Sequence, residues 1–351
     1  MTDFYTLKVA SAEKGTADSV VLQFDVPAEL QTQFDFHPGQ HLTIKSTIDG
    51  EELRRCYSIC SSPSEKGLQV GIKAIEEGRF SNFAVNEIKA GDELEVMTPQ
   101  GHFGFTPDMS RAINYLGIAV GSGITPILSM LKSALEAEPN STFTLLYGNR
   151  NSNSMMFKNE LLALKNRFPT RFHVNYFFSR ETNEVELWNG RLDGDKLRQL
   201  GAQLFNWSEF DACYVCGPEE ILESSYTALV EGGLPENNYH VERFNTANKA
   251  REKSANQSEN TQVTLKRDGR VMKIDMTSQD DSLLDAALRQ GVDLPYACKG
   301  GVCATCICKV KSGNVEMGTN YSLEADQVDA GYVLSCQAVP TTSEVEIDFD
   351  V

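Results

Sequence analysis

Four of the nine cysteines in this chain have a spacing that can hold a metal cluster. Cys298, Cys303 and Cys306 lie within one nine-residue loop, and Cys336 follows at a distance. The pattern C-x4-C-x2-C followed by a separate cysteine is typical of [2Fe-2S] clusters, whose irons are bound by four thiolates. Such a cluster carries one electron at a time. We therefore predict redox chemistry, with these four cysteines as the metal ligands.

Zinc is the alternative metal for four thiolates. Zinc sites usually show two compact C-x2-C pairs, whereas here three ligands share one loop with Gly300 and Gly301. Glycines allow the tight turns that direct thiolates and amides inward. A Rieske centre needs two histidines, and none of the five histidines lies near these cysteines in sequence. The pattern favours iron-sulfur, and we expect the neighbouring Cys308 to be a bystander in a strand.

Two short strings in the first hundred residues carry groups that suit a flavin nucleotide. The run Arg55-Cys56-Tyr57-Ser58 offers a guanidinium for a phosphate, a phenol for a flat ring and a hydroxyl for a ring nitrogen. In a strand, Arg55 and Tyr57 face one side and Ser58 the other. The run Gly78-Arg79-Phe80-Ser81 enters a helical stretch, where amides and a hydroxyl can meet a pyrophosphate. The first string alone would also fit an exposed strand with a cross-strand Arg-Tyr pair.

A glycine turn follows the apolar run 112–120 and leads into a helical stretch. A pyrophosphate can approach the backbone closely at Gly121 and Gly123, and Thr125 can donate a hydrogen bond to it. Pro126 suits the first position of a helix. The run is shorter than the full G-x-G-x-x-G pattern. We interpret it as a site for a nicotinamide dinucleotide.

Two later strings bear on the same ligand. Cys216-Gly217-Pro218 ends a strand at the carboxyl edge of the predicted sheet, where open α/β folds bind ligands. A Ser179-Arg180 pair at another strand end can bind the 2'-phosphate of NADPH, with Arg150 as a second candidate contact. NADH enzymes tend to have an acidic group there, so we expect NADPH rather than NADH. Cys213 and Cys216 face opposite sides of their strand, so we expect no disulfide between them.

Three folded parts are needed to position these groups. Alternating strands and turn signals in the first hundred residues predict a small antiparallel barrel. From about residue 112, apolar strands alternate with helical stretches, which predicts a parallel α/β sheet. The cysteine-rich end reads as a compact β-rich module with one helix. We predict a flavin-binding barrel at 1–106, a nicotinamide-binding domain at 107–244, a linker at 245–260 and an iron-sulfur domain at 261–351. If the linker is flexible, it is long enough for the last module to swing between two docking positions.

The motifs and their order resemble the ferredoxin-NADP reductase superfamily joined to a C-terminal plant-type ferredoxin. The resemblance covers the whole chain and implies an FAD-binding antiparallel β-barrel, a parallel α/β nicotinamide-binding domain and a β-grasp [2Fe-2S] domain. It implies FAD rather than the FMN of a minority branch. It also implies that Cys216 lies close to the hydride path, which makes Ser58 and Cys216 the candidate catalytic residues. The FAD-binding residues that it implies are Arg55, Tyr57, Ser58, Lys73, Gly78, Arg79, Phe80 and Ser81.

The same layout resembles the fused reductases of bacterial multicomponent oxygenases. A hydride carries two electrons and the cluster accepts one, so a flavin is required between NADPH and the cluster. At a finer level, the strings at 51–60, 99–104, 147–150 and 294–303 resemble the reductase subunits of phenylacetyl-CoA epoxidases. That resemblance implies electron delivery to a separate di-iron oxygenase that epoxidises the ring. This chain has no Glu-x-x-His motif for a di-iron site, so the oxygenase must be another polypeptide.

Other functions stay open at this point. A reductase of the same layout could serve a ketosteroid hydroxylase, an acyl-CoA desaturase or a Rieske oxygenase, with the same chemistry inside this chain. A redox-sensing module is a different class of function, although it would usually add an effector-binding or DNA-binding element and none is visible. A free-standing flavin reductase with a vestigial cluster is a further alternative.

Composition limits the partners and the compartment. The net charge of -17 argues against a nucleic-acid surface, which needs clustered Lys and Arg. No apolar run approaches the roughly 20 residues that span a bilayer, and the N-terminus lacks the layout of a signal peptide. We therefore expect a cytoplasmic protein without a membrane partner, in a compartment where free thiols stay reduced.

Overall fold

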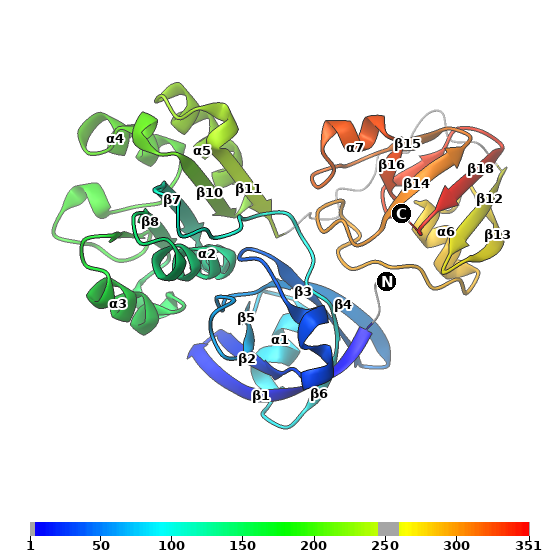
Figure 1. Ribbon diagram of the computed structural model, residues 1–351, viewed down its shortest axis with the longest axis horizontal. Coiled ribbons are helices and arrows are strands. Elements are labelled where there is room, and N and C mark those ends of the chain that lie inside the picture. Colours follow the sequence, from blue (N-terminus) through cyan, green and yellow to red (C-terminus); the bar gives the residue numbers. More distant parts are fainter. Residues whose placement is uncertain (1–3, 245–259, 351) are drawn as a thin grey trace. The chain divides into compact units, whose positions relative to one another are not determined.

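The computed structural model describes residues 4–244 and 260–350. Residues 4–53 and 57–244 form one compact unit, which holds two domains, and the C-terminal domain belongs to a second unit. The three predicted folds are all present (Figure 1). The predicted linker at 245–260 lies outside the described residues except for Asn260, which begins a strand. The exact domain boundaries stay a prediction.

The first domain is an antiparallel sheet of six strands in the order β4-β3-β6-β1-β2-β5. Ile59, directly after β4, forms an antiparallel bridge with Val70 of β5. This bridge joins the two ends of the strand order, so the sheet closes into the predicted barrel around an apolar core. The elements are β1 (Phe4–Thr16), β2 (Ser19–Asp25), η1 (Ala28–Phe34), β3 (His41–Ile48), β4 (Glu51–Ser58), β5 (Leu68–Lys73), α1 (Arg79–Asn86) and β6 (Glu93–Met97).

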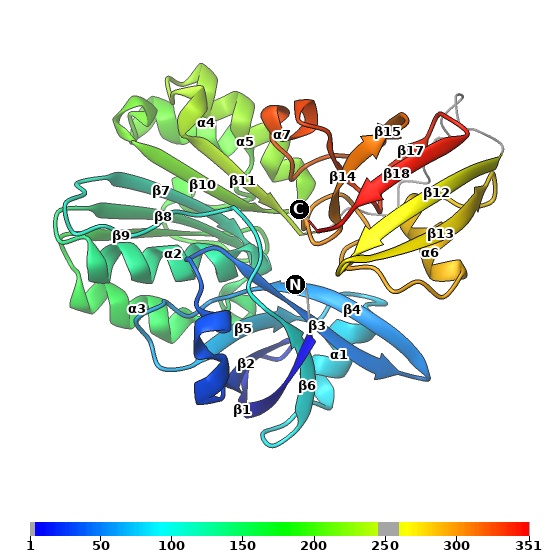
Figure 2. The ribbon, with the colours of Figure 1, turned by 45° about the vertical axis from the view of Figure 1, so that its right-hand side comes forward.

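The second domain is a parallel sheet of five strands in the order β11-β10-β7-β8-β9. Figure 2 shows helices on both faces of this sheet, as expected for a doubly wound fold. One core lies under α2 and α3 and the other under α4 and α5. Its strands are β7 (Asn114–Val120), β8 (Thr142–Asn149), β9 (Phe172–Phe178), β10 (Ala212–Gly217) and β11 (Tyr239–Arg243). Its helices are η2 (Gly121–Gly123), α2 (Ile124–Ala137), η3 (Ser152–Ser154), α3 (Lys158–Arg167), η4 (Glu186–Trp188), α4 (Gly194–Gln203), η5 (Trp207–Glu209), α5 (Glu219–Glu231) and η6 (Glu236–Asn238).

The C-terminal domain is a mixed sheet of five strands in the order β13-β12-β18-β14-β16, with a second sheet of β15 and β17. Within the described part of this domain, β12 and β18 pair in parallel and the other neighbours pair antiparallel. Leu283, Leu284 and Ala287 of α6 are buried in the core of this domain. The elements are β12 (Asn260–Arg267), β13 (Arg270–Thr277), α6 (Leu283–Arg289), β14 (Ile307–Ser312), β15 (Val315–Met317), α7 (Ala325–Asp329), β16 (Tyr332–Leu334), β17 (Ala338–Pro340) and β18 (Glu344–Asp348).

No helix within residues 4–244 and 260–350 combines the length and the apolar character that crossing a membrane requires.

Candidate functional site

The two predicted flavin strings meet in the barrel. Tyr57, near the end of β4, lies against Phe80 in the first turn of α1, with ring centroids 5.7 Å apart. Ser58 is buried and Arg55 is exposed, as strand alternation predicts. The aromatic ring of the first string therefore adjoins the helix start of the second. This arrangement fits the ring and the pyrophosphate of a flavin nucleotide.

The turn before α1 is shaped by Gly78 and Ser81. A Cβ at Gly78 would lie 2.4 Å from the Ile75 side chain and 2.5 Å from the Ser81 hydroxyl, so only glycine fits. The Ser81 hydroxyl donates to the Gly78 carbonyl at 3.0 Å. The Arg79 side chain instead contacts Glu51 in the β3–β4 hairpin. The backbone of this turn, rather than the Arg79 guanidinium, is thus the part free to meet a phosphate.

Lys73 lies where the barrel meets the α/β domain. Its Nζ donates to the Ser154 carbonyl of η3 at 2.9 Å and lies 3.4 Å from the Asp18 carboxylate. Sequence reasoning grouped Lys73 with the flavin residues. In the structure its ammonium joins the two domains, so a flavin contact would require it to leave these partners.

The predicted dinucleotide turn follows β7 directly. Gly121 has φ +60°, a conformation that favours glycine, and the Tyr147 hydroxyl donates to its carbonyl at 3.1 Å. A Cβ at Gly123 would lie 2.1 Å from the Cys216 carbonyl oxygen. The turn is therefore packed directly on the backbone of the C-G-P strand. These glycines fit the close backbone approach that a pyrophosphate requires.

One detail of this turn corrects the sequence analysis. Pro126 is the third residue of α2 and not the first, because the helix begins at Ile124. Gly123, directly before the helix, already has helical dihedral angles (φ -60°, ψ -8°), so the helix starts earlier than the proline suggests. Proline is still tolerated there, since the amides of the first turn have no intrahelical partner. Thr125 is buried, and its hydroxyl donates to the Ser122 carbonyl at 3.0 Å.

Ser58, Cys216 and Glu242 come together at the junction of the two domains. Glu242 of β11 is the register partner of Cys216 in β10. The Ser58 hydroxyl donates to the Glu242 carboxylate at 3.3 Å. Burial raises the pKa of Glu242 to about 7, against the opposing effects of His41 and the Ser58 hydrogen bond. Burial, and then the nearby Glu242, raise the pKa of Cys216 well above its ordinary value, so its thiol stays protonated.

Glu242 is a candidate functional residue that the sequence analysis did not identify. It lies in the run Tyr239–Arg243, which carries too few apolar residues to be recognised as a strand of a buried sheet. The signal that could have identified it is an acidic side chain in the strand-like segment that follows α5, the helix after Cys216-Gly217-Pro218.

The predicted 2'-phosphate site lies at the carboxyl ends of β8 and β9. The Arg180 amide donates to the Arg150 carbonyl at 2.8 Å, and the Ser179 amide donates to the Asn149 carbonyl at 3.0 Å. The two arginines are therefore neighbours, and both side chains are exposed. The adjacent Glu181 carboxylate accepts the Ser152 amide at 2.7 Å, which lowers its pKa. Two exposed guanidinium groups, those of Arg150 and Arg180, are thus available at this edge, and the neighbouring Glu181 carboxylate already accepts a backbone hydrogen bond.

Cys213 and Cys216 behave as predicted. Cys213 lies in the core under α4 and α5, whereas Cys216 lies in the core under α2 and α3. Both thiols are free. The two side chains thus face opposite sides of the sheet, which rules out a disulfide between them.

The four predicted cluster ligands form two pairs. The Cys303 thiol lies beside that of Cys298 and raises its pKa, and the Cys336 thiol does the same for Cys306. Among the described residues, no three His, Cys, Asp or Glu side chains converge as one metal ion requires. Zinc needs four ligands around one ion, whereas a [2Fe-2S] cluster takes two cysteines for each iron. The two neighbouring thiol pairs fit a [2Fe-2S] cluster.

The backbone around these cysteines is unusual. Lys299 and Ala304 both have φ +53°, which is rare outside glycine and clusters at functional sites. A Cβ at Gly301 would lie 2.4 Å from the Thr319 carbonyl oxygen. Thr305 and Ser335 are buried with hydroxyls that have no hydrogen-bond partner within the described chain. Two polar hydroxyls without partners beside four thiols fit a loop that is built around a bound group.

Cys308 is set apart from these ligands. It lies in β14, and its thiol donates to the Val333 carbonyl of the paired strand β16. This agrees with its predicted role as a bystander.

Comparison with known proteins agrees with this arrangement. Residues 6–105 match the family model of an oxidoreductase FAD-binding domain, 118–226 that of an oxidoreductase NAD-binding domain, and 265–341 that of a 2Fe-2S iron-sulfur cluster binding domain. These matches confirm the expected FAD, nicotinamide nucleotide and [2Fe-2S] cofactors.

Two curated relatives cover nearly the whole chain. It is 53% identical to one of the subunits of 1,2-phenylacetyl-CoA epoxidase from Escherichia coli, over 100% of this chain and 99% of that protein. It is 34% identical to the ferredoxin reductase component of 3-ketosteroid-9-alpha-monooxygenase from Rhodococcus rhodochrous, over 98% of this chain and 96% of that protein.

Solved structures share the fold. Phthalate dioxygenase reductase is 24% identical with a TM-score of 0.59, over 99% of this chain and 98% of that one. Ferredoxin-NADP reductase from Plasmodium falciparum is 22% identical with a TM-score of 0.58, over 69% of this chain and 96% of that one. With the motifs, the fold and the relatives in agreement, the chain belongs to the NAD(P)H-dependent oxidoreductases of the ferredoxin-NADP reductase superfamily that carry a C-terminal [2Fe-2S] ferredoxin domain.

Proposed function

We propose that this chain takes a hydride from NADPH at its FAD site and delivers electrons through a [2Fe-2S] cluster to a separate di-iron oxygenase. One observation carries the proposal. Ser58 of the predicted flavin strand meets Glu242, whose register partner Cys216 ends the predicted nicotinamide strand. Motifs from two domains therefore converge within one compact unit. Such convergence is what transfer between two bound rings requires.

For FAD we propose the residues of the two barrel strings together with Lys73. The contact between Tyr57 and Phe80 and the glycine-dependent turn at Gly78 support this assignment. Two side chains have other partners in the structure, Arg79 with Glu51 and Lys73 with Ser154. We propose that both exchange these partners when FAD binds. The proposed set is Arg55, Tyr57, Ser58, Lys73, Gly78, Arg79, Phe80 and Ser81.

We propose that Ser58 and Glu242 hold a proton at the hydride site, beside Cys216. Bound FAD supplies the conversion between two-electron and one-electron transfer. With a pKa of about 7, Glu242 exchanges its proton near neutral pH. The Ser58 hydroxyl bonds this carboxylate and can pass a proton from it to a group on its other side. The buried, protonated Cys216 thiol keeps water from the nicotinamide edge.

For the nicotinamide nucleotide we propose the glycine turn and the adjoining strand ends, with NADPH preferred to NADH. The adjacent Arg150 and Arg180 support this preference, because two guanidinium groups suit a phosphate better than a ribose hydroxyl. The proposed binding residues are Gly121, Gly123, Thr125, Pro126, Ser179, Arg180, Cys216, Gly217 and Pro218.

For the cluster we propose Cys298 and Cys303 on one iron and Cys306 and Cys336 on the other. The closeness of the two thiols in each pair supports this division. Reduced thiols are needed to load such a site, so we propose that the protein works in the cytoplasm.

For the partner we propose the di-iron subunits of a phenylacetyl-CoA epoxidase, on the strength of the 53% identity to the Escherichia coli protein. The test combines the purified chain with those subunits, phenylacetyl-CoA, NADPH and dioxygen, and measures NADPH oxidation and epoxide together. We expect epoxide in proportion to NADPH oxidised. NADPH-driven reduction of cytochrome c without epoxide would contradict the partner, and no NADPH oxidation would contradict the reductase itself.

A second candidate partner is a ketosteroid monooxygenase, which the 34% identity to its reductase component favours. The chemistry inside this chain would be the same. The same assay with the terminal monooxygenase and its steroid substrate separates the two, since only the correct partner couples NADPH oxidation to product.

A further inference from the structure

Helix α2 lies against the nicotinamide edge of the proposed hydride site and against the loop that follows its flavin strand. Gly123, directly before its first residue, lies against the Cys216 carbonyl. Eight residues beyond Ile124, Lys132 lies against the loop at 60–67 that joins β4 to β5. A helix rises about 1.5 Å per residue, so Gly123 and Lys132, nine residues apart, are separated by about 14 Å along the helix axis. One helix therefore links the nicotinamide edge to the loop that follows Ser58.

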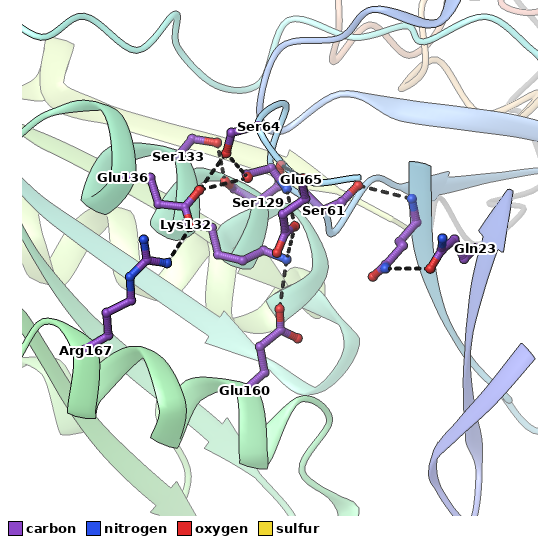
Figure 3. Close-up of polar contacts among 12 residues, drawn as sticks. Gln23, Ser61, Ser64, Glu65, Ser129, Lys132, Ser133, Glu136, Glu160 and Arg167 are labelled. Atoms are coloured by element: carbon purple, nitrogen blue, oxygen red, sulfur yellow. Dashed lines mark hydrogen bonds and ion pairs between the residues drawn. The ribbon is translucent and has the colours of Figure 1, made fainter. Parts of the chain in front are cut away.

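Lys132 is the centre of this second contact. It is only 2% exposed, although it lies on a helix of the outer layer. Its Nζ donates to Glu65 in the loop at 2.7 Å and to Glu160 of α3 at 2.8 Å (Figure 3). Glu65 in turn accepts the Ser62 amide of its own loop at 2.7 Å. A single ammonium thus joins the barrel loop to two helices of the α/β domain.

Further hydrogen bonds hold the same loop against α2. The Ser129 hydroxyl, one turn before Lys132, donates to the Ser61 carbonyl at 2.7 Å, and both residues are fully buried. Nearer the surface, the Ser64 hydroxyl donates to Glu136 at 2.6 Å. Figure 3 shows these contacts along successive turns of one helix. The loop is therefore fixed at several points over the length of α2.

Burying the charges of this cluster costs free energy, which offsets what their pairing adds to the stability of the fold. Burial alone would lower the pKa of Lys132, but the carboxylates of Glu160 and Glu65 raise it above its ordinary value, so the lysine stays charged. Buried ion pairs are often no more stabilising than well-packed apolar residues of the same volume. Their hydrogen bonds are directional, however, and fix one geometry. A cluster of this kind is better suited to positioning than to holding the domains together.

We propose that Lys132 is a positioning residue for hydride transfer. By tying the 60–67 loop to α2, it fixes the separation between Ser58 on the flavin strand and Cys216 on the nicotinamide edge. This inference rests on the proposed function, because it assigns a purpose to a contact that adjoins the proposed site without touching it. Loss of the contact should leave both nucleotide sites intact and misalign them relative to one another.

The test uses a variant that removes all three charges, Lys132→Met with Glu65→Leu and Glu160→Leu, in the full chain loaded with FAD and cluster. Lys165→Met is the matched control. Lys165 also lies on a helix of this domain and its Nζ also donates to two groups, but these are the carbonyls of Pro169 and Phe172, which belong to the same domain. The measurements are FAD content, the dissociation constant for NADPH, the single-turnover rate of flavin reduction, and amide hydrogen exchange of the 60–67 loop.

For the charge-free variant we expect unchanged FAD content, an NADPH dissociation constant within twofold of wild type, loop exchange at least tenfold faster and flavin reduction at least tenfold slower. Lys165→Met should match wild type in all four. The inference would be overturned if amide hydrogen exchange of the 60–67 loop in the charge-free variant stayed at the wild-type rate. It would also be overturned if this exchange became faster while the rate of flavin reduction stayed at the wild-type value. A wild-type chain that NADPH does not reduce would overturn the proposed function and this inference with it.

A second variant covers the case in which the charge-free protein loses flavin or fails to fold. Ser129→Ala removes only the bond to the Ser61 carbonyl and leaves all charges paired. We expect it to keep FAD and to slow flavin reduction at least threefold. The positioning role would be overturned if Ser129→Ala increased amide hydrogen exchange of the 60–67 loop but reduced its flavin at the wild-type rate.

Discussion

The Ser58 hydroxyl of the barrel donates to the Glu242 carboxylate of the α/β domain across 3.3 Å. This bond spans two domains and joins residues 184 positions apart. Glu242 lies beside Cys216 in the next strand, so the bond marks the point where the proposed flavin and nicotinamide sites adjoin. The predictions below test the groups around this point and the cluster that receives the electrons.

The raised pKa of Glu242 predicts a pH-dependent penalty on the folded state. Below about pH 4.5 the carboxyl is protonated in both the folded and the unfolded chain, so it contributes nothing. Between about pH 4.5 and 7 it ionises only in the unfolded chain, so the free energy of unfolding falls as pH rises. Glu242→Gln should remove this fall, which is on the order of 3 kcal/mol. Urea unfolding at pH 5, 6, 7 and 8 measures it.

Glu223→Gln on the exposed side of α5 is the matched control for this experiment. It should keep the pH dependence of wild type. The pKa assignment fails if Glu242→Gln and wild type lose stability in parallel as pH rises.

Gly123→Ala should weaken the nicotinamide site. The added Cβ would lie 2.1 Å from the Cys216 carbonyl oxygen, a backbone atom that cannot turn aside. We expect a cost of about 1–3 kcal/mol, typical of overpacking, and at least tenfold weaker NADPH binding. Gly121→Ala is the comparison, because nothing lies within 4 Å of its Cβ and only the strain of φ +60° remains, roughly 1 kcal/mol. Equal effects at both glycines would argue against the contact with Cys216.

Arg180→Ala should separate the two nicotinamide nucleotides. The Michaelis constant for NADPH should rise at least tenfold and that for NADH less than twofold, because only NADPH carries the 2'-phosphate. Arg191→Ala, which removes an exposed arginine paired with Glu220, should change neither constant. Steady-state kinetics with both nucleotides measures the effect, and equal increases for NADPH and NADH would refute the assignment.

Cys306→Ala should disconnect the cluster from the flavin. It leaves Cys336 alone on one iron, so the cluster is lost while NADPH still reduces a dye through the flavin. Electron delivery to the oxygenase should stop. Cys308→Ala is the matched control, since this buried thiol donates to the Val333 carbonyl of the paired strand, and it should keep the cluster. Electron delivery that survives Cys306→Ala would favour a flavin reductase with a vestigial cluster.

The sequence predicted the parts of this protein that depend on local patterns. The glycine turn at Gly121 and Gly123 was recognisable because close backbone approach needs glycine. The opposite orientations of Cys213 and Cys216 followed from strand alternation. The cysteine loop was recognisable from spacing alone. In each case the chemistry depends on residues that are neighbours in the chain.

The features that escaped prediction depend on contacts between distant segments. Glu242 gains its role from its register with Cys216 and from Ser58, neither of which can be read from the run Tyr239–Arg243. Lys132 has the sequence context of a lysine on the solvent face of a helix, but a loop 67 positions away buries it. Arg79 has the context of a phosphate ligand, but it pairs with Glu51 in a hairpin. Tertiary structure decides which partner a charged side chain finds.

The most direct test of the account is an anaerobic titration of the full chain with NADPH, in which the flavin absorbance and the signal of the reduced cluster are followed separately. We predict that both centres become reduced in the wild-type chain, and that in Cys306→Ala the flavin alone does. A wild-type chain whose flavin is fully reduced while its cluster stays oxidised would contradict the proposed path from NADPH through FAD to Cys298, Cys303, Cys306 and Cys336.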